Sequence, residues 1–193
     1  TGSVAYFSME IAVDAKMPTD SGGLGVLAGD TLRGAADLHA PMVGVTLLHR
    51  QGYFRQRLDE HGQQSVHPAT WAVETLVEEL PPVVTVEIEG RPVRIRAWQY
   101  LVKGATGGTL PVYLLDTALS ENTLEDRQLT DALYGGDDRH RLRQEAVLGL
   151  GGIAMLRALG HTDVQVYHMN EGHSALLTFA LLEERIQGRR VPV

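Results

Sequence analysis

The chain has 193 residues, of which 44% are hydrophobic and 21% are charged, a composition typical of a globular domain with one hydrophobic core. Its formal net charge of −7 and the lack of a Lys/Arg run disfavour nucleic-acid binding, and the absence of cysteine excludes disulfide and thiolate chemistry. No apolar run is long enough to span a bilayer, and the first residues do not resemble a signal peptide. We therefore expect a cytoplasmic protein that binds neither nucleic acids nor membranes.

The first 48 residues predict a β-α-β unit. Residues 4–8 and 42–48 are short apolar runs typical of buried parallel strands. Residues 24–38 carry apolar side chains near the helical period of 3.6 residues. Gly29 and Gly34 within this helix indicate close packing on the sheet. A right-handed crossover would make the two strands parallel.

The rest of the chain predicts more strands and helices of the same sheet. We expect core strands at 110–116 and 164–167, a short irregular helical region at 120–133, a long helix at 139–159, a last helix at 174–186 and, from the residues GRRVPV, the entry to a further strand. Glycines in the middle of the long helix indicate tight backbone packing; they are Gly149, Gly151 and Gly152. The expected fold is a doubly wound, Rossmann-like α/β lobe with its ligand face at the carboxyl ends of the strands.

Residues 84–100 predict a β-hairpin, because apolar and polar residues alternate on both sides of a Glu-Gly-Arg-Pro turn. The first strand carries Glu87 and Glu89. We expect them to face Arg94 and Arg96 on the second strand. We interpret the hairpin as a structural flap inserted into the lobe. Earlier in the chain, residues 49–56 follow the second strand and form either part of a ligand site or a surface turn.

A glycine turn between the first strand and the first helix is the sharpest functional signal. Ser21 precedes Gly22 and Gly23, where a backbone without Cβ atoms can approach a ligand closely. The unpaired N–H groups and the positive dipole end of the following helix favour a phosphate there. The same glycines could equally serve only a tight turn, and the turn matches neither the P-loop nor the dinucleotide-binding pattern.

Other polar residues have two interpretations each. Asn170, Glu171 and His173 start the last helix and could bind a ligand, although capping of the helix is the simpler interpretation. Glu10 follows the first strand and could bind sugar hydroxyls, although an exposed loop acid is more common. The spacing of the histidines at 168 and 173 does not predict a metal site. Three charged residues of the long helix predict a solvated face; they are Arg141, Arg143 and Glu145.

Several motifs, in this order, resemble the α-glucan (glycogen/maltodextrin) phosphorylase family, especially its shorter bacterial type. They are YFSMEIAVDAKMPTDSGGLGVLAGDTLRGAADL, GVTLLHRQGYFRQ, RLRQE and VYHMNEGHSALL. The resemblance implies a GT-B glycosyltransferase of two Rossmann-like lobes, with residues 1–193 as a single domain, the amino-terminal lobe. It implies pyridoxal 5′-phosphate on a lysine of the carboxyl-terminal lobe. The implied reaction is phosphorolysis of the terminal α-1,4-linked glucose, with α-1,4-glucan and phosphate as substrates and glucose 1-phosphate as product. It also leaves a homodimer open.

The resemblance assigns roles to particular residues. Backbone N–H groups of Gly22 and Gly23 would bind the substrate phosphate, and no catalytic side chain is expected in this lobe. The residues expected to line the sugar pocket are Leu24, Glu10, Glu171, His173 and, in a gating turn that is shorter here, Asp137. Animal enzymes have other residues at three nearby positions, which are Ser21, Ala12 and Val26 in this chain.

Two other classes compete with this interpretation. Glycogen and starch synthases share the architecture and use a glycine turn to bind a nucleotide sugar, but they carry a lysine where this chain has Asp20. A non-catalytic glucan-binding module would need exposed aromatic platforms, and only 6% of residues are aromatic. We expect this chain alone to have no phosphorolytic activity.

Overall fold

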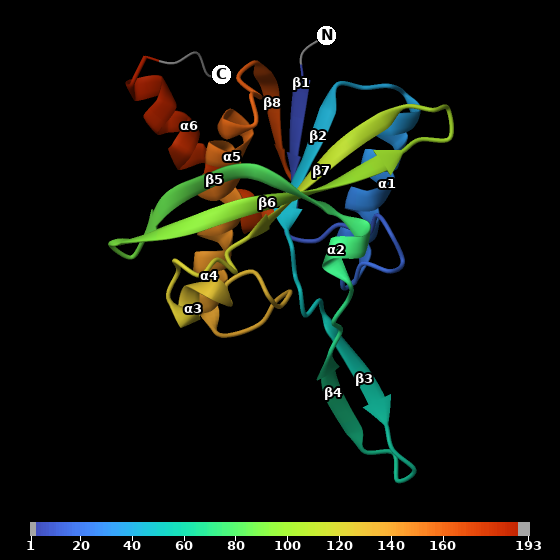
Figure 1. The fold of residues 1–193 in the computed structure, drawn as a ribbon. Coiled ribbons are helices and arrows are strands. Elements are labelled where there is room, and N and C mark those ends of the chain that lie inside the picture. The colour runs from blue at the N-terminus through green and yellow to red at the C-terminus, as the bar shows by residue number, and fades with distance from the viewer. Residues whose placement is uncertain (1–2, 189–193) are drawn as a thin grey trace.

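The computed structural model describes residues 3–188, which form a three-layer α/β/α lobe (Figure 1). The central sheet has six strands in the order β5-β6-β7-β2-β1-β8. Their bounds are β1 (Ser3–Phe7), β2 (Met42–Leu47), β5 (Glu78–Ile88), β6 (Arg91–Lys103), β7 (Thr109–Asp116) and β8 (Val164–Met169). β1 pairs in parallel with β2 and β8, and β2 pairs in parallel with β7. The β-α-β unit and the α/β class predicted from the sequence are therefore confirmed.

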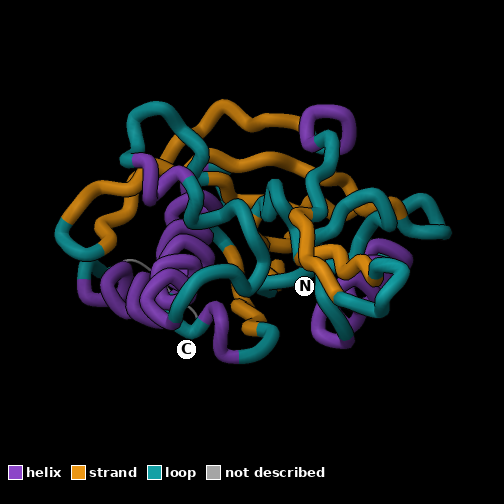
Figure 2. Tube along the Cα trace, turned by 90° about the horizontal axis from the view of Figure 1, so that it is seen from below, coloured by secondary structure: helices purple, strands orange, loops and turns teal. Residues whose placement is uncertain are grey.

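Helices cover both faces of this sheet (Figure 2). Helix α1 (Gly23–Asp37) lies on one face. The other face is covered by α4 (Asp138–Ala146), a π-helical turn (Val147–Gly151), α5 (Gly152–Ala158) and α6 (Leu177–Ile186). The predicted long helix is thus continuous, but it widens into an underwound π-helical turn at its glycines. Two single-turn helices, α2 (Val73–Leu76) and α3 (Leu124–Arg127), complete the lobe. None of the described helices is long and apolar enough to cross a bilayer.

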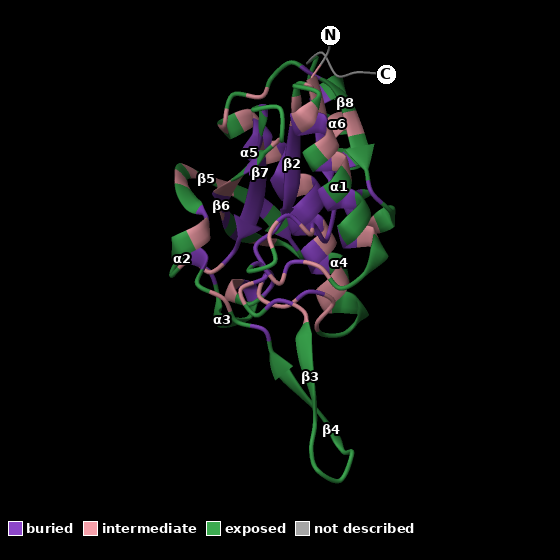
Figure 3. Cartoon of the chain, turned by 90° about the vertical axis from the view of Figure 1, so that its right-hand side faces the viewer, coloured by how far each residue is buried: buried purple, intermediate pink, exposed green. Residues whose placement is uncertain are grey.

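Successive residues of the central strands point alternately into two hydrophobic cores, one on each face of the sheet. Phe7 of β1 and Leu115 of β7 point to the core under α4, α5 and α6, whereas Tyr6 and Leu114 point to the core under α1. This alternation is the period of two expected of a strand buried on both faces. Figure 3 shows the buried strands between the two helical layers.

The mid-helix glycines pack as tightly as predicted. A Cβ at Gly152 would lie 2.5 Å from the ring of Phe7, and one at Gly149 would lie 2.6 Å from the backbone nitrogen of Leu177. The prediction for α1 holds only in part. Gly29 packs closely, but against the carbonyl of Ala12 in the loop after β1 rather than against the sheet.

Some expectations for α1 were wrong. A Cβ at Gly34 would meet nothing within 4 Å, so close packing does not explain that glycine. Only some of the apolar residues at the helical period face the core: Ala28 and Ala35 are buried, whereas Leu27 and Leu38 are exposed. Leu32 is buried as well. The reason is that α1 presents small residues to the sheet and to the loop after β1, so its apolar stripe does not coincide with its largest side chains.

The hairpin at 84–100 exists but is not a flap. Its strands β5 and β6 are an antiparallel edge of the main sheet, because β6 pairs with β7 over its carboxyl-terminal half. The predicted acid–arginine pairs were also wrong: Arg94 lies opposite Thr85, and Arg96 lies opposite Val83. A long bent strand can pair with its hairpin partner and with the sheet at the same time, and alternation alone does not distinguish these cases.

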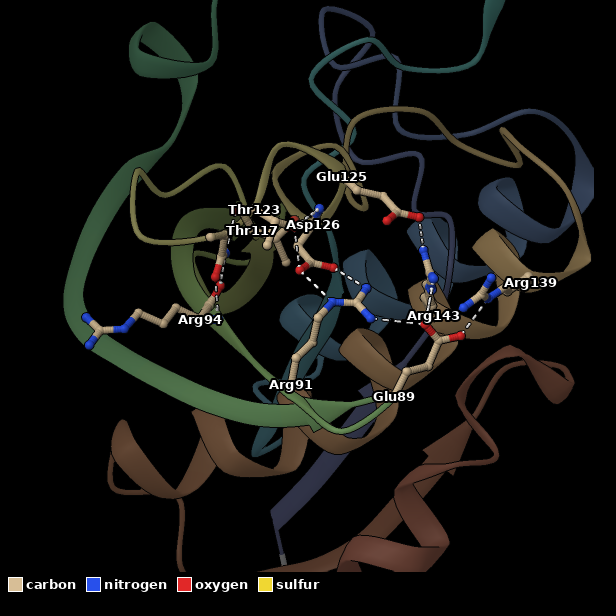
Figure 4. Close-up of polar contacts among 10 residues, drawn as sticks. Glu89, Arg91, Arg94, Thr117, Thr123, Glu125, Asp126, Arg139 and Arg143 are labelled. Carbon is tan, nitrogen blue, oxygen red and sulfur yellow. Dashed lines mark hydrogen bonds and ion pairs between the residues drawn. The ribbon is translucent and has the colours of Figure 1, made fainter.

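Glu89, in the turn of this hairpin, forms ion pairs with three arginines (Figure 4). Arg139 contributes its Nε at 2.7 Å, Arg143 its Nη2 at 2.5 Å and Arg91 its Nη1 at 3.1 Å. The hydrogen bond from Arg139, followed by those from Arg143 and Arg91, holds the pKa of the Glu89 carboxyl far below its usual range. Arg143 is buried, so the predicted solvated face of α4 was wrong at this position.

A second hairpin, which the sequence analysis did not predict, projects from the lobe. It consists of β3 (Phe54–Leu58) and β4 (Gln64–Pro68), all exposed, and it extends away from the three layers (Figures 1 and 3). The residues following β2 therefore lead into a protruding hairpin. The further strand predicted from GRRVPV involves residues 189–193, which lie outside the described residues.

Candidate functional site

The predicted site residues gather at the carboxyl ends of β1 and β8, where the loop after β1, the start of α1, the turn before α4 and the turn before α6 meet. The buried side chain of Asn170 ties these parts together. Its backbone N–H donates to the carbonyl of Phe7 at 2.9 Å, and its Nδ2 donates to Ser8 Oγ at 3.1 Å and to the carbonyl of Leu24 at 3.4 Å. The end of β8 is thereby fixed to the end of β1 and to the first turn of α1.

The glycine turn forms an open helix start. Gly22 is the N-cap of α1 and makes no side-chain capping bond, and Gly23 is the first helical residue. Both are exposed, and a methyl group on either would meet nothing within 4 Å. The first N–H groups of a helix have no partner within it and carry its positive dipole end. The turn therefore presents donors to open space, as an anion site requires.

Glu10 lies directly behind this turn and is buried, with 3% of its surface exposed. The prediction of an exposed loop acid was wrong. Its Oε2 accepts the backbone N–H of Ser21 at 2.6 Å, and its Oε1 accepts the hydroxyl of Tyr134 at 2.8 Å. A Cβ at Gly25 would lie 2.9 Å from Glu10 Oε2, so a glycine is needed at 25 for the carboxylate to reach its position.

Tyr134 links this carboxylate to the other predicted side of the site. Its ring centroid lies 5.5 Å from that of His173, and the guanidinium carbon of Arg141 lies 5.5 Å from it. Nδ1 of His173 is 3.1 Å from Oε1 of Glu145. Arg141 and Glu145 therefore face the candidate site, which corrects the prediction of a solvated helix face.

Glu171 does not cap the last helix. It occupies the N-cap of the 3₁₀ turn Gly172–Ser174, makes no side-chain capping bond and has φ 65°. A non-glycine residue with positive φ is uncommon and is enriched at functional sites. Its side chain is exposed, so the capping interpretation favoured by the local sequence was wrong for this residue.

The remaining predicted residues are placed as follows. Leu24 is half-buried in the first turn of α1. Asp137 is the N-cap of α4 and accepts the backbone N–H of His140 at 2.8 Å, which gives it a structural role. His168 stacks on Tyr6, with ring centroids 4.6 Å apart. Among the described residues there is no cluster of His, Asp and Glu that could hold a metal ion.

Acidic side chains surround the glycine turn. Burial raises the pKa of Tyr134, and so do its hydrogen bond to Glu10 and the charges of Glu10 and Glu171. Burial, followed by the charge of Glu10, raises the pKa of Asp20. A bound anion would thus depend on backbone N–H groups and on positive charge from outside this cluster.

The sequence analysis did not identify Tyr134 as a site residue. Its φ is 56° and it precedes Gly135 and Gly136. The aromatic residue before two glycines was the available signal, but its partner Glu10 is 124 positions away. A groove of about 300 Å³ lies beside Tyr134 at the base of the projecting hairpin, between Tyr53 and His67 on one side and residues 132–135 on the other.

Comparison with known proteins identifies clear relatives, although no family model matches the chain. The chain is 39% identical to a glycogen phosphorylase of Mycobacterium tuberculosis over 95% of its length. It is 39% identical to a maltodextrin phosphorylase of Thermococcus litoralis over 91%, and 33% identical to a glycogen phosphorylase of Aquifex aeolicus over 92%. It spans only 22%, 21% and 26% of these relatives' own lengths. The resemblance predicted from the motifs is confirmed.

Proposed function

We propose, from the homology of this chain to glycogen and maltodextrin phosphorylases, that the full-length protein is a GT-B α-glucan phosphorylase and that this lobe supplies half of its active-site cleft. The reaction would release the terminal α-1,4-linked glucose of a glucan as glucose 1-phosphate. The observation that carries the proposal is 39% identity to two such enzymes over more than nine-tenths of the chain. The open glycine turn at the start of α1 supports it independently.

In this proposal the lobe binds and orients the substrates. The N–H groups of Gly22 and Gly23 hydrogen-bond the phosphate, and Leu24 packs against the glucosyl group. On the sugar side, Glu171 and His173 line the pocket, Glu10 stands behind the turn, and Asp137 lies in the turn before α4. Because donors fixed in a folded backbone need no reorganisation when charge develops, such a turn stabilises a phosphate in the transition state as well as in the ground state.

The cofactor would be pyridoxal 5′-phosphate, bound to a lysine of the second lobe, and its phosphate would supply the proton donor and acceptor of the reaction. The described residues leave room for a phosphate beside the turn, because a Cβ added at Gly22 or Gly23 would meet no protein atom within 4 Å. Because Glu10 and Asp20 lie behind the turn, a phosphate bound there would need positive charge from another part of the protein. Lysine and arginine side chains of the second lobe are the expected source.

The test replaces Gly23 by Ala in the full-length protein. Since its Cβ would meet no protein atom, the fold should tolerate the change. The methyl group would instead occupy the space of the anion, and we expect glucose 1-phosphate release from maltodextrin and phosphate to fall about 100-fold or more, as when one fixed anion donor is lost. The matched control is Gly34→Ala in the same helix, where a Cβ also meets nothing within 4 Å and activity should not change.

Equal activities of the two variants would contradict the assignment of the turn. If the unmodified full-length protein instead transferred glucose from ADP-glucose or UDP-glucose and released no glucose 1-phosphate, a synthase function would replace the proposal. We further expect residues 1–193 alone to release no glucose 1-phosphate, because half of the cleft and the cofactor lysine would be missing.

A further inference from the structure

Tyr134 holds an unusual backbone conformation for a bulky residue. Its φ of 56° lies in the left-handed region, and Gly136, two residues later, has φ 75°. Such conformations persist where surrounding contacts fix them. Here the ring is held by His173 on one side, by the guanidinium of Arg141 and by an edge contact with Tyr53 at 6.5 Å. These contacts therefore hold the phenol oxygen at a fixed point.

That fixed point is one oxygen of the buried Glu10 carboxylate. The two carboxylate oxygens have different donors: Oε1 accepts the Tyr134 hydroxyl at 2.8 Å, and Oε2 accepts the Ser21 backbone N–H at 2.6 Å. Beyond these, the Ser21 hydroxyl is 3.4 Å from Oε1 and 3.3 Å from Oε2. Tyr134 is thus the close donor that fixes the rotation of the carboxylate.

The orientation of Glu10 matters because its carboxylate is adjacent to the donors of the glycine turn. A carboxylate is itself a strong acceptor for backbone N–H groups at a helix start. Without the hydroxyl of Tyr134, Oε1 would lose its close donor and could turn toward the N–H groups that follow Ser21. It would then compete with the phosphate for the same donors and repel it by its charge.

We propose that Tyr134 is a positioning residue for the phosphate-binding turn, because its hydroxyl fixes the Glu10 carboxylate on the Ser21 amide and leaves the N–H groups of Gly22 and Gly23 free for the anion. This inference rests on the proposed function and adds to it a residue on which phosphate affinity depends. It also connects the phosphate side of the site to His173 through a single aromatic ring.

The first experiment uses Tyr134→Phe in the full-length protein, which keeps the ring contacts and removes only the hydroxyl. We expect the KM for phosphate to rise about tenfold, as for the loss of one hydrogen bond to a charged group. The KM for maltodextrin and the kcat at saturating phosphate should change less than about twofold, because the lost interaction acts on phosphate binding alone. The matched control is Tyr100→Phe, which removes a hydroxyl–carboxylate bond of 3.2 Å to Asp14 on the α1 side of the sheet and should leave all three values unchanged.

A double variant tests whether Tyr134 acts through Glu10. In Glu10→Gln, the side chain at 10 is uncharged, so adding Tyr134→Phe should raise the KM for phosphate by less than about threefold further. Full additivity of the two changes, or an equal rise of both KM values in Tyr134→Phe, would overturn the proposal in favour of a purely structural role.

A second readout does not depend on catalysis. In the full-length protein, hydrogen exchange of the Ser21 amide should be about tenfold faster in Tyr134→Phe than in Tyr100→Phe, because the acceptor of that amide is no longer fixed. Unchanged exchange would overturn the positioning role even if the enzyme is a phosphorylase. Faster exchange, combined with no glucose 1-phosphate release by the unmodified full-length protein, would refute the proposed function and leave the link between Tyr134, Glu10 and Ser21 in place.

Discussion

At the scale of single residues, His49 shows how the region behind the site depends on pH. It follows β2, is fully buried, and its Nε2 lies 2.9 Å from the carbonyl oxygen of Met9. Its Nδ1 has no hydrogen-bond partner among the described residues. Burial lowers the pKa of His49 from 6.5 to about 4, although the Met9 carbonyl and the charge of Glu10 act in the opposite direction. The folded protein therefore holds this imidazole neutral.

We predict that His49 destabilises the protein in acid. Between pH 6.5 and pH 4 the unfolded chain binds a proton at this residue and the folded chain does not, so the free energy of unfolding falls as the pH decreases through that window. A shift of this size corresponds to about 3 kcal/mol at its low-pH limit. His49→Gln keeps a donor for the Met9 carbonyl but cannot titrate. Urea unfolding of both proteins at pH 7.5 and pH 4.5 should show a smaller loss in the variant, whereas equal losses would refute the prediction.

Elements are joined by buried charges, and Asp116 at the end of β7 is the clearest case. Its carboxylate accepts the Nε of Arg96 at 2.8 Å and the indole N–H of Trp98 at 3.0 Å, both from β6. It also accepts Arg50, which follows β2, at 3.0 Å. Burial alone would raise the pKa of Asp116, but the backbone N–H of Ala118, the guanidinium of Arg50 and the indole N–H of Trp98 hold it below its ordinary value.

We predict that Asp116→Ala lowers the free energy of unfolding by about 3–5 kcal/mol, because it leaves two arginines without their buried counter-charge and an indole N–H without an acceptor. The matched control is Glu121→Ala, which breaks an exposed pair with Arg94 at 3.4 Å and should have no measurable effect. Denaturant unfolding at pH 7 measures both. Similar midpoints for the two variants would mean that the buried network does not hold the ends of β2, β6 and β7 together.

The elements also show what local patterns can predict. The unit β1-α1-β2 was predictable because apolar runs, a helical period and a glycine turn all lie within 48 residues. The projecting hairpin β3–β4 was not, because its strands bury no face and so carry no regular apolar alternation. The hairpin β5–β6 was recognised but misplaced, because the alternation of apolar and polar residues does not reveal that β6 also pairs with β7.

The candidate site divides in the same way. The open turn at Gly22 and Gly23 was visible in the sequence because its chemistry is that of the backbone alone. The burial of Glu10 and the role of Tyr134 depend on a contact between residues 124 positions apart, and no local pattern contains it. For Glu171, a residue type favoured at helix starts concealed a backbone conformation that only the structure reveals.

At the scale of the whole molecule, the last strand and the last helix of the described residues carry exposed apolar side chains. Strand β8 is the last strand of the sheet, and α6 packs on α5 and on the π-helical turn at the same end of the chain (Figure 1). Large apolar side chains are exposed on both, namely Val166 and Met169 of β8 and Phe179, Leu182 and Ile186 of α6. The three residues of α6 are spaced by three and four positions and so form one stripe of the helix. The three relatives named above are longer than this chain, which spans 21–26% of their lengths.

We therefore predict that further polypeptide covers the α6 stripe in the full-length protein. Phe179→Asp should lower its thermal midpoint by several degrees, because a buried phenylalanine contributes about 2–3 kcal/mol that an aspartate does not. In residues 1–193 alone, where the 64% exposed side chain of Phe179 already faces solvent, the same change should leave the midpoint unaltered and reduce self-association in sedimentation. The control is Leu38→Asp, at an 81% exposed position that follows α1, which should change neither protein. If Phe179→Asp and Leu38→Asp behave alike in the full-length protein, the stripe is a free surface.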